Sequence, residues 1–262
     1  MGGGPSRYPL DMSDDGFHPV FFELHSGLPR EGPGDDESTL RALRRCTELP
    51  DRPDILDVGC GPGMQTLALL GATNGTMTAT DFYQQFLDQL AESAHATGIG
   101  ERLRMVRADM NELPFGPDSF DLIWSEGAAY IMGITEAFTK WRAFLRPRGY
   151  IVVTEVSWLV ENVPEEVYRL FYDQYPGVTD IAGNLARIEA CGYDIVDHFT
   201  LPAESWWTHY QTPLEAKFPA LREKYADDPA ALAVVEETAN EHRICREYPG
   251  TYGYEFYIAR AR

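Results

Sequence analysis

The chain has 262 residues, of which 44% are hydrophobic, and this is enough to build one α/β domain with an insertion. Its 41 acidic and 22 basic side chains give a formal charge of −19, which disfavours binding to the phosphates of DNA or RNA. The sequence shows no long apolar run, no secretory pattern in residues 1–16 and no C-x-x-C pair, so we expect a cytoplasmic protein without a membrane partner or a metal site.

The first 34 residues are rich in glycine, proline and aspartate, and we expect them to be irregular. Within them, the segment 21–34, FFELHSGLPREGPG, begins apolar and places Arg30 beside a Gly-Pro-Gly turn. We expect residues 17–34 to fold over a binding site, as part of an N-terminal lid segment of residues 1–35. A helix is expected from about 36 to 49, with Asp35 or Asp36 as its N-cap.

Residues 54–66, DILDVGCGPGMQT, are the most informative stretch of the chain. A short apolar run predicts a buried parallel strand that carries Asp57, and glycines then turn the chain into an apolar helix. A glycine turn between a strand and a helix is a nucleotide-binding device, but its G-x-G-x-G spacing differs from the dinucleotide pattern because position 64 is Met. A carboxylate before the glycines would repel a pyrophosphate and suits a ligand with a cationic or amine-bearing end.

Further strands follow in order along the chain. Residues 76–81, TMTATD, predict a second strand that ends in Asp81, at about the βαβ distance at which an acidic residue meets ribose hydroxyls. Residues 103–109, LRMVRAD, predict a third strand that ends in Asp109. The segments 113–127 and 145–158 are expected to contain the fourth and fifth strands.

These pieces together resemble the motifs of class I methyltransferases that depend on S-adenosyl-L-methionine (SAM), of the ubiquinone/menaquinone-biosynthesis type. The likeness lies in D-x-G-x-G-x-G at 57–63, the two acidic strand ends, LPFGPDSFD at 113–121 and LRPRG at 145–149, where Arg148 stands at a position that is often Gly in the family. It covers roughly residues 40–160. The resemblance implies a Rossmann-like α/β fold with a seven-stranded, mostly parallel sheet, an antiparallel last strand, helices on both faces and helical cap insertions.

The C-terminal part is expected to add the caps and to complete the sheet. Residues 157–182 predict a helical cap over the site, and a helix that follows them is expected to stop at Gly192. A sixth strand is expected after it, then helical material over 204–248, then a seventh strand at 252–261, which the resemblance makes antiparallel. We therefore expect residues 36–262 to form a single domain with cap insertions at about 157–182 and 204–248.

The resemblance assigns roles in cofactor binding to individual residues. Gly59, Gly61 and Gly63 are expected to pass close to the amino-acid part of SAM, and Asp57 to bind its amine or else to cap the following helix. The other expected contacts are Asp81 with both ribose hydroxyls, Phe82 with the adenine ring, Asp109 and the Met110 backbone with the adenine amine, Arg30 with the carboxylate, and Ser125 at the end of the fourth strand.

The residues that would act on an acceptor are less clearly marked. Glu126 and His209 are the candidates for a general base, and Tyr130 is the candidate for an orienting group. A cluster of Trp206, Trp207, His209 and Tyr210 is either ordinary packing or an acceptor pocket with aromatic faces. A base is not required by the reaction, because positioning and exclusion of water can suffice.

We predict that the protein transfers a methyl group from SAM to a small-molecule acceptor and releases S-adenosylhomocysteine (SAH). The alternative is a sensor or partner subunit that binds SAM or SAH without transfer, and a further alternative is an enzyme that uses SAM to move another group. Fold alone does not decide among them. The sequence names neither the acceptor nor the oligomeric state.

Overall fold

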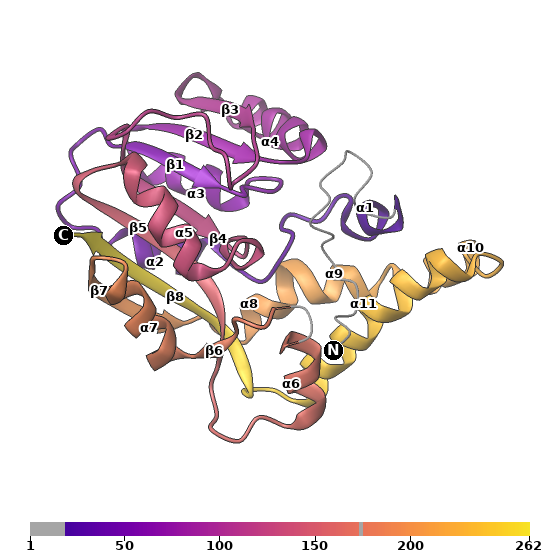
Figure 1. Ribbon diagram of the computed structural model, residues 1–262. Helices are drawn as coiled ribbons and strands as arrows, with labels where there is room; N and C mark the ends of the chain where they lie inside the picture. The colour runs from indigo at the N-terminus through magenta and orange to yellow at the C-terminus, as the bar shows by residue number, and fades with distance from the viewer. Residues whose placement is uncertain (1–18, 173–174) are drawn as a thin grey trace.

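A central eight-stranded sheet organises the molecule, and the computed structural model describes residues 19–172 and 175–262 (Figure 1). The strand order is β3-β2-β1-β4-β5-β8-β7, with β6 paired to β5 off this path. The first five strands are parallel to one another, and β8 is antiparallel to both β5 and β7. The strands are β1 (Asp54–Val58), β2 (Thr76–Asp81), β3 (Leu103–Arg107), β4 (Phe120–Glu126), β5 (Leu145–Trp158), β6 (Thr179–Asp180), β7 (Tyr193–Thr200) and β8 (Tyr252–Ala261).

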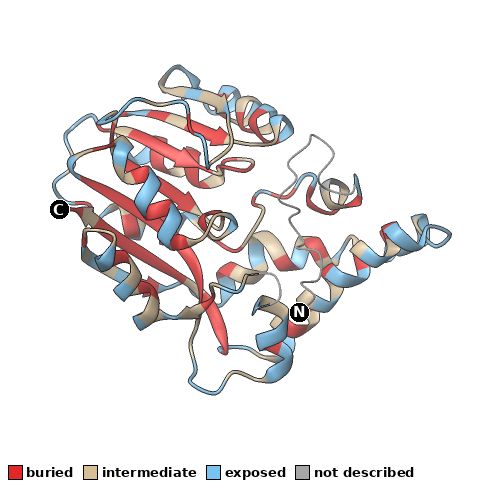
Figure 2. Ribbon diagram, viewed as in Figure 1, coloured by how far each residue is buried: buried red, intermediate tan, exposed pale blue. Residues whose placement is uncertain are grey.

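This architecture confirms the expected Rossmann-like fold, and the two-residue β6 is an addition to the seven predicted strands. The central strands β1, β4, β5 and β8 are buried along most of their length, as strands covered on both faces must be (Figure 2). The edge strand β7 instead alternates exposed residues with buried or half-buried ones. The third strand ends at Arg107, two residues before the predicted end at Asp109.

Helices cover both faces of the sheet. On one face, α5 and α7 pack against the sheet through Phe138, Trp141 and Ile188, while α2 and α3 pack on the other through Ala42, Leu69 and Leu70. The α-helices are α1 (Pro19–His25), α2 (Asp36–Leu43), α3 (Met64–Ala72), α4 (Gln84–Thr97), α5 (Ile134–Trp141), α6 (Glu165–Tyr172), α7 (Ile181–Ala190), α8 (Glu204–Trp206), α9 (Thr212–Glu215), α10 (Phe218–Lys224) and α11 (Pro229–Glu247). Short 3-10 or π turns are η1 (Gly100–Arg102), η2 (Ala129–Ile131), η3 (Arg142–Phe144) and η4 (Trp207–Gln211).

The N-terminal segment contains a helix where the sequence was expected to be irregular. Helix α1 forms because Val20 and Leu24 lie one turn apart and are fully buried, with Leu28, against the C-terminal helices α9 to α11. Lys217, just before α10, then donates from Nζ to the carbonyl oxygens of Leu24 (2.7 Å) and Glu23 (3.0 Å), and so caps the end of α1. The segment is thereby fixed between the sheet and the C-terminal helices (Figure 1).

The helix predicted over residues 36–49 is shorter than expected. It begins as predicted, because Asp35 is its N-cap and accepts a hydrogen bond from the Ser38 amide at 2.7 Å. It ends at Leu43, where the chain turns to bury Cys46 in the core beside the sheet. The turns and bends that follow lead into β1.

The first residues of β5 show a strained backbone. Arg148 has φ of +61°, a backbone conformation that favours glycine. The turn is retained in part because its carbonyl oxygen accepts a hydrogen bond from Arg260 Nε of β8 at 2.8 Å. The strain lies at the N-terminal end of the strand, away from the edge at which α/β folds bind ligands.

Candidate functional site

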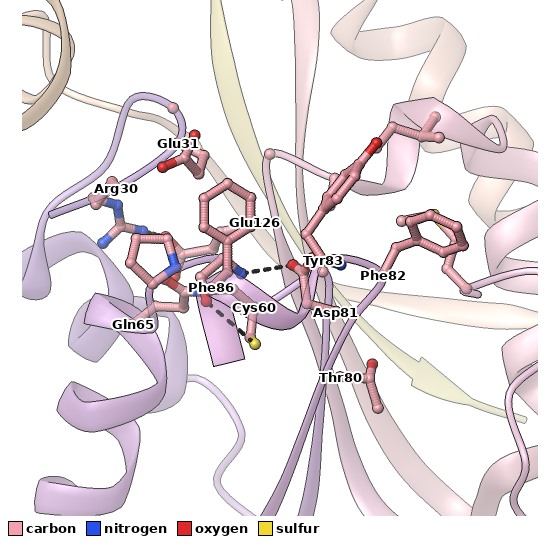
Figure 3. A pocket seen from close by; sticks show the side chains of 18 of the residues that line it. Arg30, Glu31, Cys60, Gln65, Thr80, Asp81, Phe82, Tyr83, Phe86 and Glu126 are labelled. Carbon is pink, nitrogen blue, oxygen red and sulfur yellow. Dashed lines mark hydrogen bonds and ion pairs between the residues drawn. The ribbon is translucent and has the colours of Figure 1, made fainter. Parts of the chain in front are cut away.

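A cavity lies where the carboxyl ends of the first four strands meet the N-terminal segment (Figure 3). This is the crevice in which doubly wound sheets bind ligands. Five stretches of chain line it: residues 30–33, the glycine turn 59–62 after β1, residues 80–83 at the end of β2, 108–111 after β3, and 126–128 after β4. Phe21, Gln65, Phe86, Tyr130 and Ile131 complete the wall.

The glycine turn has this shape because three of its positions have a backbone conformation that favours glycine, and two of them leave no space for a side chain. Gly59, Gly61 and Gly63 all have positive φ, at +69°, +53° and +88°. A Cβ on Gly59 would lie 2.4 Å from the Cβ of Ala128, and one on Gly63 would lie 2.3 Å from a methyl group of Leu90. The turn is therefore packed tightly against the protein on two sides, and Gly61 faces the cavity between them.

Asp81 lies on the cavity wall with its carboxylate fixed in orientation. Its Oδ2 accepts the Gly61 amide and its Oδ1 accepts the Tyr83 amide, both at 2.9 Å. Burial raises the pKa of Asp81, and these backbone donors oppose the effect by stabilising the charged form. Each oxygen retains a further lone pair, so the group can accept two hydrogen bonds from a bound diol.

Asp57 is fully buried behind the glycine turn and does not itself line the cavity. Its Oδ2 accepts Thr66 Oγ1 at 2.5 Å and Gln65 Nε2 at 3.3 Å, which ties β1 to the start of α3. Its Oδ1 has no hydrogen-bond partner among the described residues, and burial raises the pKa of Asp57 to about 7. The structure thus shows the contact with the following helix, and it leaves one oxygen of Asp57 without a partner among the described residues.

Arg30 and Glu126 form a buried ion pair beside the cavity, with side-chain exposures of 4% and 2%. Glu126 Oε1 also accepts Thr39 Oγ1 at 2.7 Å and Trp124 Nε1 at 2.8 Å, so the carboxylate is fixed from three sides. Arg30 Nη1 has no partner within the described part of the chain. One edge of the guanidinium is therefore orientated by Glu126, and the other is available to an anion.

Gly34 makes room for this arginine. A Cβ at position 34 would lie 2.5 Å from three atoms of the Arg30 guanidinium. The Gly34 amide donates to the Ser205 carbonyl oxygen at 3.2 Å, which fixes the Gly-Pro-Gly turn to helix α8. The glycine noted in the sequence is thus required by packing against Arg30.

The far side of the cavity carries the residues expected near an adenine ring. Phe82, Asp109 and Met110 all line it. Asp109 Oδ1 accepts the backbone amide and the side-chain amide of Asn111, at 2.8 and 3.0 Å, so the loop after β3 is held by this carboxylate. Ser125 differs from the expectation: it is fully buried, donates to the Val58 carbonyl oxygen at 2.8 Å and lies outside the cavity lining.

The three residues considered for acceptor chemistry are not brought together. Tyr130 lines the cavity, with its ring edge-on to that of Tyr175 at 6.2 Å. Glu126 lines it too, but its carboxylate is already bound by Arg30. His209 lies in a separate surface hollow with Arg41 and Glu204.

The aromatic residues around His209 pack within the C-terminal region. Trp206 contacts the rings of Tyr252 and Tyr254, and Trp207 contacts the ring of His242. None of the four lines the described cavity. Of the two interpretations of this cluster, the structure favours packing.

Sequence reasoning did not single out Glu31. Both of its carboxyl oxygens are buried in the cavity wall and lack hydrogen-bond partners among residues 19–172 and 175–262. Burial raises the pKa of this carboxyl group to about 9. An isolated glutamate in a Gly/Pro-rich segment reads as a surface residue, so only the fold reveals that it is enclosed.

Comparisons with known proteins agree with the fold. Residues 55–149 match a family described as a methyltransferase domain. A demethylmenaquinone methyltransferase of Staphylococcus aureus is 32% identical over 120 residues, which are 45% of this chain and 48% of that protein. The chain spans about half the length of the curated relatives it matches. This relative supports the menaquinone part of the predicted family type. The ubiquinone part stays a prediction.

Two solved structures show the same fold over nearly the whole chain. A SAM-dependent methyltransferase from Thiobacillus denitrificans, in complex with SAH, has a TM-score of 0.79 at 21% identity and covers 94% of this chain and 99% of that one. The 4+2 cyclase SpnF has a TM-score of 0.73 at 21% identity, over 93% of this chain and 92% of its own. Within the described residues, every helix is too short or too polar to cross a bilayer.

Proposed function

We propose that this chain, which carries a class I SAM-dependent methyltransferase domain, transfers a methyl group from SAM to a small-molecule acceptor. The observation that carries the proposal is the cavity at the strand ends, where a glycine turn, a fixed carboxylate and a half-paired buried arginine face one ligand-sized space. Each of these groups matches a different part of SAM.

The residues present fit the cofactor as follows. Asp81 would accept both ribose hydroxyls, and Phe82, Asp109 and the Met110 backbone would surround the adenine ring. Arg30 would bind the carboxylate through Nη1, because its other edge is already fixed by Glu126. The free oxygen of Asp57 would accept the amine, directly or through water.

The protein's own contribution to the reaction would be positioning and exclusion of water. Bound SAM supplies a methyl group that is already activated by its sulfonium, and the acceptor displaces it in line. Tyr130, Ile131 and Phe21 add apolar wall to the cavity, and we propose that the acceptor lies against them. Glu126 is better suited to orient Arg30 than to remove a proton, so we propose that Tyr130 orients the acceptor and that Glu126 is a positioning residue.

We further propose that residues 1–35 act as a lid on a single domain of residues 36–262. Support comes from the described part of the segment, where Arg30, Glu31 and Pro33 line the cavity while Leu24 anchors α1 on the C-terminal helices. Lids of this kind commonly order on ligand binding. The cap insertions at 157–182 and 204–248 contain α6 and α8 to α11, and they would shape the acceptor side.

Calorimetry with SAM, SAH and NAD tests the cofactor assignment. We expect SAM and SAH to bind with micromolar affinity, about −8 kcal/mol, and NAD not to bind. Binding of NAD without either of the others would overturn the proposal. A panel of small neutral and cationic metabolites incubated with methyl-labelled SAM would then identify the acceptor.

The runner-up is a protein that binds SAM or SAH without methyl transfer. It is kept because the same fold occurs in a protein named as a cyclase, so fold does not determine the reaction. Tight SAH binding with no labelled product from any acceptor would favour this second function over the first.

A further inference from the structure

Glu31 presents an unusual carboxyl group to the cavity. Both of its oxygens are buried, and neither has a hydrogen-bond partner in the part of the chain that the structure describes. Leaving a buried polar group unpaired costs about 1–3 kcal/mol, and a charged one costs more. A bound ligand that supplies the missing hydrogen-bond partner would offset this cost.

The position of Glu31 indicates which part of a ligand it would meet. Its Cγ lies 3.4 Å from the place that a Cβ on Gly61 would occupy, so its stem crosses the glycine turn at this residue. The amide of the same Gly61 donates to Asp81 Oδ2 at 2.9 Å. Glu31 and Asp81 therefore both reach the cavity beside Gly61.

The burial of Glu31 and the charges around it favour the uncharged form of its side chain. Burial raises its pKa to about 9, with a further rise from the negative charge of Asp81 and an opposing effect from Lys217. Its chain neighbour Arg30, which is paired with Glu126, is not among the groups that shift it. At neutral pH the side chain is then a carboxylic acid, with one O–H to donate and lone pairs to accept.

We propose that Glu31 is a second ribose contact, facing Asp81 across the hydroxyl groups of the bound cofactor. This inference rests on the proposed SAM site. The two carboxyl groups have complementary roles, because Asp81 is fixed by backbone donors and accepts from the hydroxyls, whereas Glu31 donates to a hydroxyl oxygen. A vicinal diol offers both kinds of atom, and an ammonium group offers only donors.

The test compares two ligands that share the ribose and differ in the amino-acid part. SAH carries both, and 5′-methylthioadenosine carries the adenosine moiety alone. Kd values for both are measured by calorimetry at pH 7.5 with the wild-type chain, Glu31→Ala, Glu31→Gln and, as the matched control, Arg30→Ala. Glu31→Leu fills the same space without polar atoms and serves as a second removal variant, and thermal denaturation checks that each variant is folded.

We expect Glu31→Ala and Glu31→Leu to weaken both ligands by about tenfold, the scale of a lost hydrogen bond with a partner left unpaired. Glu31→Gln, whose amide donates like the neutral acid, should stay within about threefold of wild type. Arg30→Ala should weaken SAH and leave 5′-methylthioadenosine unchanged. Without ligand, Glu31→Leu should melt at a higher temperature than wild type, because an unpaired buried carboxyl group is gone.

Three results would overturn the proposal. Unchanged affinity for 5′-methylthioadenosine in folded Glu31→Ala or Glu31→Leu would remove Glu31 from the ribose site. A loss for SAH alone would place it on the amino-acid part instead, and a loss in Glu31→Gln as large as in Glu31→Ala would contradict its role as a neutral donor. If the wild-type chain bound neither ligand, the SAM site itself would be refuted.

Discussion

Replacing Glu126 by Gln separates two roles for this residue, orientation of Arg30 and removal of a proton from an acceptor. The carboxylate accepts from Arg30, Thr39 and Trp124, and both members of the ion pair are nearly inaccessible. Gln keeps the shape but lacks the charge, and its amide group must face at least one of the three donors. The buried guanidinium is then left without its counter-charge.

Removing one partner of a buried ion pair typically costs 3–5 kcal/mol. The shape is conserved here and one amide oxygen can still accept, so we expect a loss of about 3 kcal/mol in the free energy of unfolding. For a chain of this size, that corresponds to a fall of about 6 to 12 °C in Tm. Saturating SAH should recover part of the loss, because its carboxylate gives Arg30 a new counter-charge.

The assay is thermal denaturation of wild type and Glu126→Gln with and without SAH. Glu237→Gln, an exposed position on α11, is the matched control and should change Tm by less than about 1 °C. The expected signature is a variant that is less stable without ligand and more strongly stabilised by it. If Glu126→Gln had the same Tm as wild type and lost only methyl transfer, Glu126 would act as a general base. The positioning role would then be refuted.

Three further predictions concern other residues of the fold. Asp81→Ala should weaken SAM binding by about 2–3 kcal/mol, some 30- to 150-fold, since the ribose loses its acceptors; equal affinity by calorimetry would remove Asp81 from the site. Arg148→Gly should raise the free energy of unfolding by about 1 kcal/mol in urea, because φ of +61° is strained for any residue with a Cβ; a loss of stability would contradict this. Burial raises the pKa of Glu155 to about 8, so between about pH 5 and 8 the folded chain keeps a proton that the unfolded chain has released. The free energy of unfolding should therefore fall as pH rises from about 5 to 8, by up to about 1.4 kcal/mol per pH unit. Glu155→Gln should flatten that part of the Tm-against-pH curve, and an unchanged slope would show that this carboxyl group does not titrate there.

The sequence was sufficient where the information is local. The glycine turn and Asp81 lie within one strand–helix–strand unit, so their spacing fixes their relation before any tertiary contact is known. The mostly parallel sheet and its antiparallel last strand followed from the resemblance and are confirmed. The cofactor roles of these residues stay predictions, because the structure gives their geometry and not their ligand.

What could not be predicted depends on contacts between distant parts of the chain. Arg30 meets Glu126 across 96 positions, and nothing near either residue indicates the other. Helix α1 looked irregular because the apolar partners of Leu24 lie in α9 to α11. His209 was placed near the site because aromatic residues surround it, yet those residues pack on β8 and α11 instead.

The place of β8 in the sheet bears on how the chain folds during synthesis. This strand lies between β5 and β7, and it is made after both of them and after all of the helices α8 to α11. Until it emerges from the ribosome, β5 has an unpaired apolar edge, a surface that invites pairing with other chains. The growing chain therefore exposes this edge throughout that interval, and we expect substitutions that slow β8 insertion to lower yield without altering the finished protein.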